Sequence, residues 1–279
     1  MSSFLREVAG SLFSIAFPSL CSLCNQELTE ISLTGVCVAC WDSLEAWDGP
    51  ACPNCGLPIV SHQSLESADS RCGDCRAEEF GFDQARTFGL YRDHLRAVIL
   101  QLKFRHRERL GTRLGSLLAA PWNSIVVPAD SGETLVVPVP LHSGRLRERG
   151  YNQSELLSRG LVQALSRSRQ TPAPRIDCGI LRKTRDTLPQ TGLSIAARHE
   201  NVRGAFAVAS PERVRERAVV LVDDVMTTGA TLSACALALK KAGARQVLAL
   251  TLARATPQFP DLDADRSLAA VDDLSSGRP

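Results

Sequence analysis

Residues 218–232 read AVVLVDDVMTTGATL, and this stretch decides the fold. Its apolar beginning is typical of a strand buried on both faces, and the strand ends at Asp223 and Asp224. A Thr-Gly turn leads into LSACALALKKAG, which has the composition of a helix, and QVLALTLAR then predicts a second buried strand. Strand, turn, helix and strand in this order predict an α/β fold with a parallel sheet.

The turn has the features of an anion site. The first N–H groups of a helix are unpaired and carry partial positive charge, so they can hold a phosphate, and Gly229 allows close approach of the backbone. We call this turn the phosphate loop; its members are Met226, Thr227, Thr228, Gly229, Ala230 and Thr231. Two adjacent carboxylates would repel a phosphate, so we expect Asp223 and Asp224 to face ribose hydroxyls or Mg²⁺. A phosphate beside a diol predicts a phosphorylated sugar as the ligand. An ordinary capped helix would explain a single Asp or Thr but not the whole string.

Charge is distributed unevenly along the 279 residues. Residues 1–80 carry three basic and eleven acidic side chains, whereas residues 140–217 carry fifteen and seven. A basic middle indicates a surface for anions, either the phosphates of a small ligand or a nucleic-acid backbone, although Arg-rich stretches also form ordinary solvated surfaces. Aromatic residues make up only 5% of the chain and do not alternate with the basic ones, which limits base stacking. No apolar run approaches the roughly 18 residues that span a bilayer.

Eight of the ten cysteines form four CxxC pairs before residue 76. Two such pairs supply the four thiolates of a tetrahedral zinc site. In chain order the pairs give a first tetracysteine site and a second one; the ligands are Cys21, Cys24, Cys37 and Cys40 in the first and Cys52, Cys55, Cys72 and Cys75 in the second. A disulfide framework or an iron–sulfur site would be the alternatives, but evenly spaced CxxC units favour two structural zinc ions. Free thiolates imply a reducing compartment, so we expect a cytoplasmic protein. Cys178 and Cys235 are expected to be small buried residues.

The rest of the chain divides at changes in pattern. We expect an amphipathic helix at 1–17, a double zinc ribbon at 18–80, an α/β domain at 81–254 and a disordered acidic tail at 255–279. Within the α/β domain, helical spacing follows residue 91, TLVVPVPL predicts a buried strand, and SELLSRGLVQALSR predicts a helix. The N-terminal segment lacks the positive charge of a signal peptide.

Three strings carry a resemblance to known families. VLVDDVMTTGAT resembles the phosphoribosyl-pyrophosphate (PRPP) motif of type I phosphoribosyltransferases, and neither a Walker A loop nor a GxGxxG fingerprint is present there. VVPVPLHSGRLRERGYNQSELL at 136–157 and RDTLPQTGLSIAARHENVRGAF at 185–206 resemble the ComF family of competence proteins, which join a double zinc ribbon to a phosphoribosyltransferase-like domain. The resemblance covers about residues 18–254.

The resemblance implies roles for particular residues. Asp223 and Asp224 would be the catalytic pair that binds the ribose diol, and the phosphate loop would hold the 5′-phosphate. The pyrophosphate would lie against Pro138, Val139, Pro140 and Leu141, with cations from Arg145, Arg149 and Arg185, and Lys103 as a less secure candidate. Mg²⁺ would accompany PRPP, and residues 183–193 would form a hood that excludes water.

Two classes of function follow. The first is a Mg²⁺-dependent phosphoribosyltransferase with an unidentified acceptor, linked to DNA uptake in natural transformation, or a nucleobase salvage enzyme of the same type. The second is a non-catalytic, PRPP-responsive protein that binds single-stranded DNA and contacts the DNA-uptake machinery. Tyr151 could stack on a base, whereas Asn152 more simply caps the helix that follows.

Overall fold

The computed structural model describes residues 20–28, 32–59, 70–105, 107–127, 133–168, 174–187 and 195–256. The helix expected at 1–17, residues 188–193 of the expected hood and residues 257–279 of the expected tail lie outside this part of the chain. Within it, no helix is long and apolar enough to cross a membrane.

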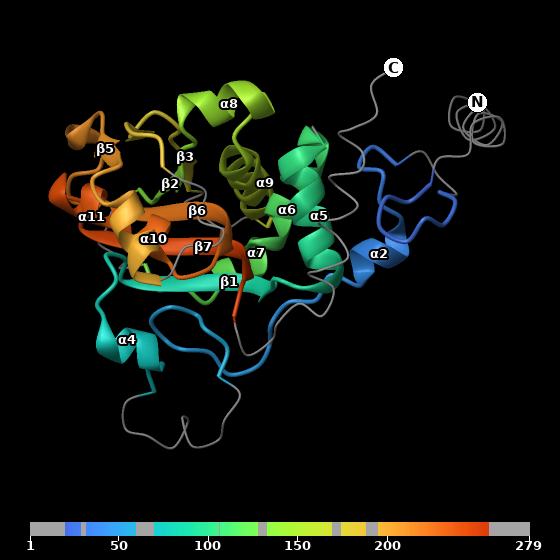
Figure 1. Cartoon of the computed structure of the whole chain (residues 1–279), viewed down its shortest axis with the longest axis horizontal. Helices are drawn as coiled ribbons and strands as arrows, with labels where there is room; N and C mark the ends of the chain where they lie inside the picture. Colours follow the sequence, from blue (N-terminus) through green and yellow to red (C-terminus); the bar gives the residue numbers. More distant parts are fainter. Residues whose placement is uncertain are drawn as a thin grey trace.

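A five-stranded parallel sheet forms the centre of the molecule (Figure 1). Its strand order is β1-β7-β6-β2-β3, and the strands span Gln84–Leu90 (β1), Leu135–Pro138 (β2), Arg175–Ile176 (β3), Ala218–Met226 (β6) and Gln246–Arg254 (β7). β6 and β7 are buried over nearly their whole length. The predicted α/β fold with a parallel sheet is therefore confirmed, and β6 occupies its middle.

Two apolar layers cover the sheet because successive side chains of a strand point to opposite faces. Val219 and Leu221 belong to one buried cluster, and Val220 and Val222 belong to the other. The helices and the small antiparallel pair of strands span Asp93–Phe104 (α5), Glu108–Leu117 (α6), Ala119–Trp122 (α7), Ser143–Arg149 (α8), Gln153–Arg167 (α9), Ile195–Val202 (α10), Ala230–Lys241 (α11), Leu181–Lys183 (β4) and Phe206–Val208 (β5), with a 3-10 turn at Pro211–Arg213 (η1). Buried residues of α5, α6 and α9 pack on the Val220 face, and those of α11 pack on the Val219 face.

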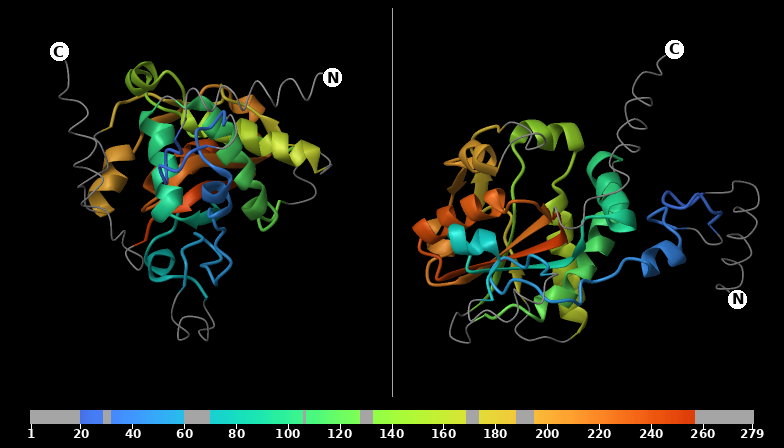
Figure 2. Two further views of the ribbon diagram at one scale, coloured as in Figure 1. Left: turned by 90° about the vertical axis from the view of Figure 1, so that its right-hand side faces the viewer. Right: turned by 60° about the horizontal axis from the view of Figure 1, so that its bottom comes forward.

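The two cysteine-rich segments lie on different faces of the sheet. The first, with the short helix α2 (Val38–Asp42), shares the buried cluster of α5 and α9, whereas the second, with α4 (Gly73–Ala77), shares that of α11. Figures 1 and 2 accordingly show α2 beyond α5 and α4 at the other end of the molecule. Each segment therefore depends on the sheet for the apolar surface that it buries.

The cysteine knuckles repeat the same backbone bonds. In the first knuckle Cys21 N donates to Gln26 O at 2.7 Å, and in the second Cys52 N donates to Leu57 O at 2.8 Å. The turn of the second knuckle contains Gly56, whose φ is +66°, and a Cβ there would lie 2.9 Å from Ala85 O. Glycine is therefore needed at this position both for the backbone conformation and for the close approach to β1.

The two cysteines outside the CxxC pairs differ from each other. Cys235 is buried in α11, as predicted. Cys178 is exposed, so the prediction of a buried residue was wrong for it. It follows β3 in an irregular connection, where backbone runs over the surface.

Candidate functional site

The paired carboxylates lie where β6 approaches its carboxyl end. Asp223 Oδ1 accepts hydrogen bonds from Ser154 Oγ at 3.0 Å and from the Asp224 backbone N–H at 2.9 Å. Asp224 is 8% exposed and pairs with Lys103, whose Nζ lies 2.9 Å from Oδ1. The end of α5 therefore delivers a cation to the acids, and the start of α9 delivers a hydroxyl.

This environment gives the acids different electrostatic properties. Burial, followed by the neighbouring charge of Asp224, raises the pKa of Asp223 to about 7. Burial alone would lower the pKa of Lys103, but the Asp224 carboxylate outweighs it and the pKa of Lys103 is raised. Lys103 thus stays charged, and Asp223 changes its protonation state near neutral pH.

The phosphate loop connects β6 to the N-terminus of α11. Gly229 is the N-cap of α11 with φ +80°, and a Cβ there would lie 2.8 Å from Met226 Cε and 3.1 Å from Phe80 Cε1. Arg254 donates from Nη1 to Thr227 O. Among the described residues, the N–H groups of Thr227, Thr228 and Gly229 donate to no protein acceptor, so the loop presents the donors that an anion requires.

The proposed pyrophosphate segment, 138–141, lies beside the acids. β2 pairs with β6 so that Pro138 stands opposite Val222, and Val139 N donates to Val222 O at 3.0 Å. Asn152 caps α9, as predicted, by accepting from Ser154 N at 3.1 Å. The same side chain donates to Val139 O at 3.0 Å, and this second bond fixes the segment next to Asp223.

The arginines predicted to bind pyrophosphate occupy three different settings. Arg185 donates to the carbonyl oxygens of Asn201 and Arg203 at 3.0 Å each, Arg149 lies over the ring of Phe104 at 5.3 Å, and Arg145 is partly buried. Lys183 interacts electrostatically with both Arg145 and Asp223, and burial, followed by Arg145, lowers its pKa. The roles of these arginines toward pyrophosphate stay predictions.

Several residues of the site were missed or misassigned from sequence. Tyr151 is 8% exposed and donates its hydroxyl to Leu102 O, so it supports α5 beside Lys103 and does not stack on a base. Ser154, Lys183 and Arg254 were not identified at all. Each is separated from the acids by many residues in sequence, so only the tertiary structure reveals the contacts.

Both tetracysteine sites are assembled. In each site the four sulfur atoms lie within 4.8 Å of one another. The closest pairs are 3.7 to 3.8 Å apart in the first site and 3.5 to 3.7 Å in the second. A tetrahedral zinc with bonds of about 2.3 Å separates its sulfur ligands by about 3.8 Å, so the donor sets fit zinc. All ten cysteines are free thiols, which excludes the disulfide framework.

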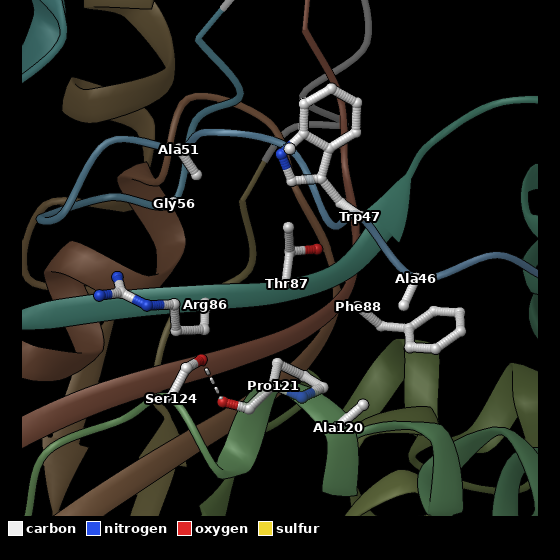
Figure 3. A pocket seen from close by; sticks show the side chains of 11 residues that line it. Ala46, Trp47, Ala51, Gly56, Arg86, Thr87, Phe88, Ala120, Pro121 and Ser124 are labelled. Atoms are coloured by element: carbon white, nitrogen blue, oxygen red, sulfur yellow. Dashed lines mark hydrogen bonds between the residues drawn. The ribbon is translucent and has the colours of Figure 1, made fainter. Parts of the chain in front are cut away.

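A separate cavity of about 280 Å³ lies between β1, α7 and the segment that joins the two tetracysteine sites (Figure 3). Its polar groups do not converge, because Ser124 Oγ donates to Pro121 O and the guanidinium of Arg86 extends away from Trp47. It lacks the paired acids and the helix N-terminus found at the end of β6.

The raised pKa of Asp223 makes a testable prediction about stability. A carboxyl whose pKa rises on folding stabilises the fold fully below its unfolded value of 3.8, and this contribution falls as the pH rises to about 7. Asp223→Asn should therefore raise the free energy of unfolding at pH 8 by more than about 1 kcal/mol and have little effect near pH 4. Urea denaturation of both proteins at the two pH values measures this difference. An equal effect at both would contradict the assignment.

Comparison with known proteins gives a consistent result. A model of the double zinc ribbon domain matches residues 12–76, and a model of the phosphoribosyl transferase domain matches residues 157–269. Competence protein F of Haemophilus influenzae is 31% identical over 84% of this chain and 96% of its own length. DNA utilization protein YhgH of Escherichia coli K12 is 33% identical over 86% and 99%, and competence protein ComFC of Bacillus subtilis is 27% identical over 78% and 84%.

Proposed function

The chain belongs to the ComF family of competence proteins, and on this premise we propose that it binds PRPP with Mg²⁺ at the end of β6 and transfers the phosphoribosyl group to an acceptor in DNA utilization. One observation carries the proposal: buried paired acids adjoin a helix N-terminus whose loop N–H groups have no protein acceptor.

The residues divide the ligand between them. Asp223 and Asp224 accept hydrogen bonds from the two ribose hydroxyls, because ionised carboxylates are acceptors only. The N–H groups of the phosphate loop hold the 5′-phosphate, and the segment 138–141, fixed by Asn152, holds the pyrophosphate. Arg145, Arg149 and Arg185 supply cations around the pyrophosphate. The double zinc ribbon holds two structural zinc ions.

The reaction is a substitution at the anomeric carbon. The bond from this carbon to the pyrophosphate oxygen breaks, the pyrophosphate leaves with the electron pair, and a nitrogen or oxygen of the acceptor forms the new bond and releases its proton to water. Bound Mg²⁺ would neutralise the pyrophosphate oxygens. The protein orients the sugar, and Lys103 holds Asp224 in its ionised form beside the ribose.

The acceptor is tested with a panel. PRPP and Mg²⁺ are incubated with purine bases, orotate, ammonia or single-stranded DNA, and pyrophosphate release is measured. We expect at least one acceptor to raise the release about tenfold above the hydrolysis blank, and we expect Asp223→Asn to abolish this increase. A purine or orotate as the sole acceptor would indicate salvage. Binding of PRPP without release for any acceptor would contradict the transferase and leave a non-catalytic PRPP-responsive protein.

A second candidate function, binding of single-stranded DNA, is favoured by one exposed aromatic. Phe104 is 60% exposed at the end of α5, next to Lys103, and Arg149 of α8 lies over its ring. A base can stack on such a ring while neighbouring arginines contact phosphates. The uptake machinery would then deliver the strand to this surface.

We expect Phe104→Ala to weaken single-stranded DNA binding about tenfold, because stacking contributes about 1–3 kcal/mol per base. Val126→Ala, which truncates a side chain that is 69% exposed elsewhere, serves as the control. Fluorescence anisotropy at several salt concentrations measures both the affinity and its salt dependence. Equal affinity for the two variants and the wild type would exclude the stacking surface.

A further inference from the structure

We propose that Arg254 is a positioning residue for the phosphate loop, and that it makes the loop's conformation depend on the second tetracysteine site but not on the first. The inference rests on the proposed function of the loop as the phosphate site. It assigns to one half of the double ribbon a part in ligand binding.

Arg254 reaches both partners from a buried position. It is the last residue of β7, it is 2% exposed, and its Nη1 donates to Thr227 O. Its Nε is buried without a hydrogen-bond partner among the described residues. The guanidinium is thus withdrawn from water and committed to a single carbonyl of the loop.

The charge of Arg254 is balanced by the second tetracysteine site. Burial lowers the pKa of Arg254, and Cys55, Cys72, Asp74 and Cys75 oppose this effect electrostatically. Four thiolates around one zinc ion carry a net charge of about −2. Such a cluster stabilises a buried guanidinium, whereas neutral thiols would leave it without a counter-charge.

The bond to Thr227 O fixes the orientation of a donor. A trans peptide is planar, so its C=O and the following N–H point in opposite directions. Holding Thr227 O toward Arg254 therefore turns the N–H of Thr228 away from the guanidinium. A single bond at the start of the loop thus sets the orientation of an amide that the phosphate would use.

The segment after the second site contacts the loop and its helix directly. The ring of Phe80 lies against Gly229, where a Cβ would approach Cε1 to 3.1 Å, and Gly81 N donates to Ser233 Oγ at 2.9 Å. The first site is attached elsewhere: Ser22 exchanges hydrogen bonds with Gln101 of α5, and Arg107 donates to Thr34 O at 3.1 Å. Only the second site has contacts that lead to the loop within the part of the chain that the structure describes.

The test uses two reporter amides in the full-length protein without ligand. Ser233 N donates to Gly229 O at 2.8 Å and Ala255 N donates to Met226 O at 3.0 Å, so these bonds bracket the loop. We expect Arg254→Met to accelerate hydrogen exchange of both amides about tenfold, and Arg254→Lys to restore part of the protection. Arg86→Met is the matched control: Arg86 also faces Cys52 and Cys55, but it donates to Pro53 O and Ala85 O and not to the loop. Zinc content of each variant is measured in parallel, and unchanged exchange in Arg254→Met would overturn the proposal.

A second pair of variants separates the two sites. Cys37 and Cys72 hold the same place in their sites, since each is the N-cap of a short helix. We expect Cys72→Ser to accelerate exchange of Ser233 and Ala255 about tenfold and Cys37→Ser to leave it within about twofold. Equal effects of both would overturn the asymmetry. PRPP affinity is then measured by calorimetry: if wild type does not bind PRPP, the proposed function fails while the exchange result stands, and if wild type binds but exchange is unaffected, only this inference fails.

Discussion

Asp223→Asn is expected to weaken binding of PRPP and Mg²⁺ at least about 100-fold at pH 8, which corresponds to about 2.8 kcal/mol. In the wild type the carboxylate is ionised at this pH and can accept hydrogen bonds beyond those from Ser154 and Asp224 N. An amide has one acceptor oxygen, which these two donors already use, and no charge. Hydrogen bonds to a charged group contribute about 1.5–3 kcal/mol each, so losing two of them gives this magnitude. Isothermal titration calorimetry measures the affinity.

The control is an aspartate at the other end of the same sheet. Asp83 precedes β1, pairs with Lys240 and accepts from Val247 N at 2.8 Å. Asp83→Asn should bind PRPP as the wild type does. Asp224→Asn is less informative alone because it removes the partner of Lys103, so it is best combined with Lys103→Met. Wild-type affinity in Asp223→Asn would remove the ligand from this end of β6.

Removal of zinc is expected to unfold both cysteine-rich segments before the sheet. Purified protein should contain two zinc ions per chain, and chelation should abolish hydrogen-exchange protection around residues 21–40 and 52–75. The expected loss of stability exceeds about 5 kcal/mol, because a structural zinc contributes about 10–16 kcal/mol to the folding of isolated zinc-finger peptides. The cysteines are themselves part of the buried clusters, so little else remains to hold these segments. Metal analysis and exchange measured by mass spectrometry test the prediction.

Cys178→Ser provides the control for the metal sites. Cys178 is exposed and lies outside both tetracysteine sites, so its replacement should leave two zinc ions per chain. A protein that folds normally with a metal content near zero would contradict the zinc assignment. Loss of one zinc in Cys178→Ser would contradict the assignment of the ligands.

The features that were predictable from sequence are those encoded locally. β6, the turn and α11 follow one another without interruption, and the CxxC spacing brings sulfurs together within each knuckle. The capping role of Asn152 was likewise local, since its partner is two residues away. Such patterns need no knowledge of how distant segments pack.

The features that could not be predicted depend on long-range packing. Lys103 reaches Asp224 because α5 packs on the same face as α9, and Arg254 reaches Thr227 because β7 lies beside β6. Tyr151 was misread because its sequence neighbours are polar, although its ring is buried against α5. Burial of a single aromatic or arginine is a tertiary property that no local spacing reveals.

The placement of the two ribbons on opposite faces of the sheet bears on the order of synthesis. A ribosome delivers residues 21–75 before any strand of the sheet, yet the apolar surfaces that cover both ribbons are completed only by β7, at Arg254. Until then the nascent ribbons lack a packing partner, and metal capture is what can hold them folded. Cells starved of zinc should therefore yield chains that fail during translation, not finished molecules that lose activity afterwards.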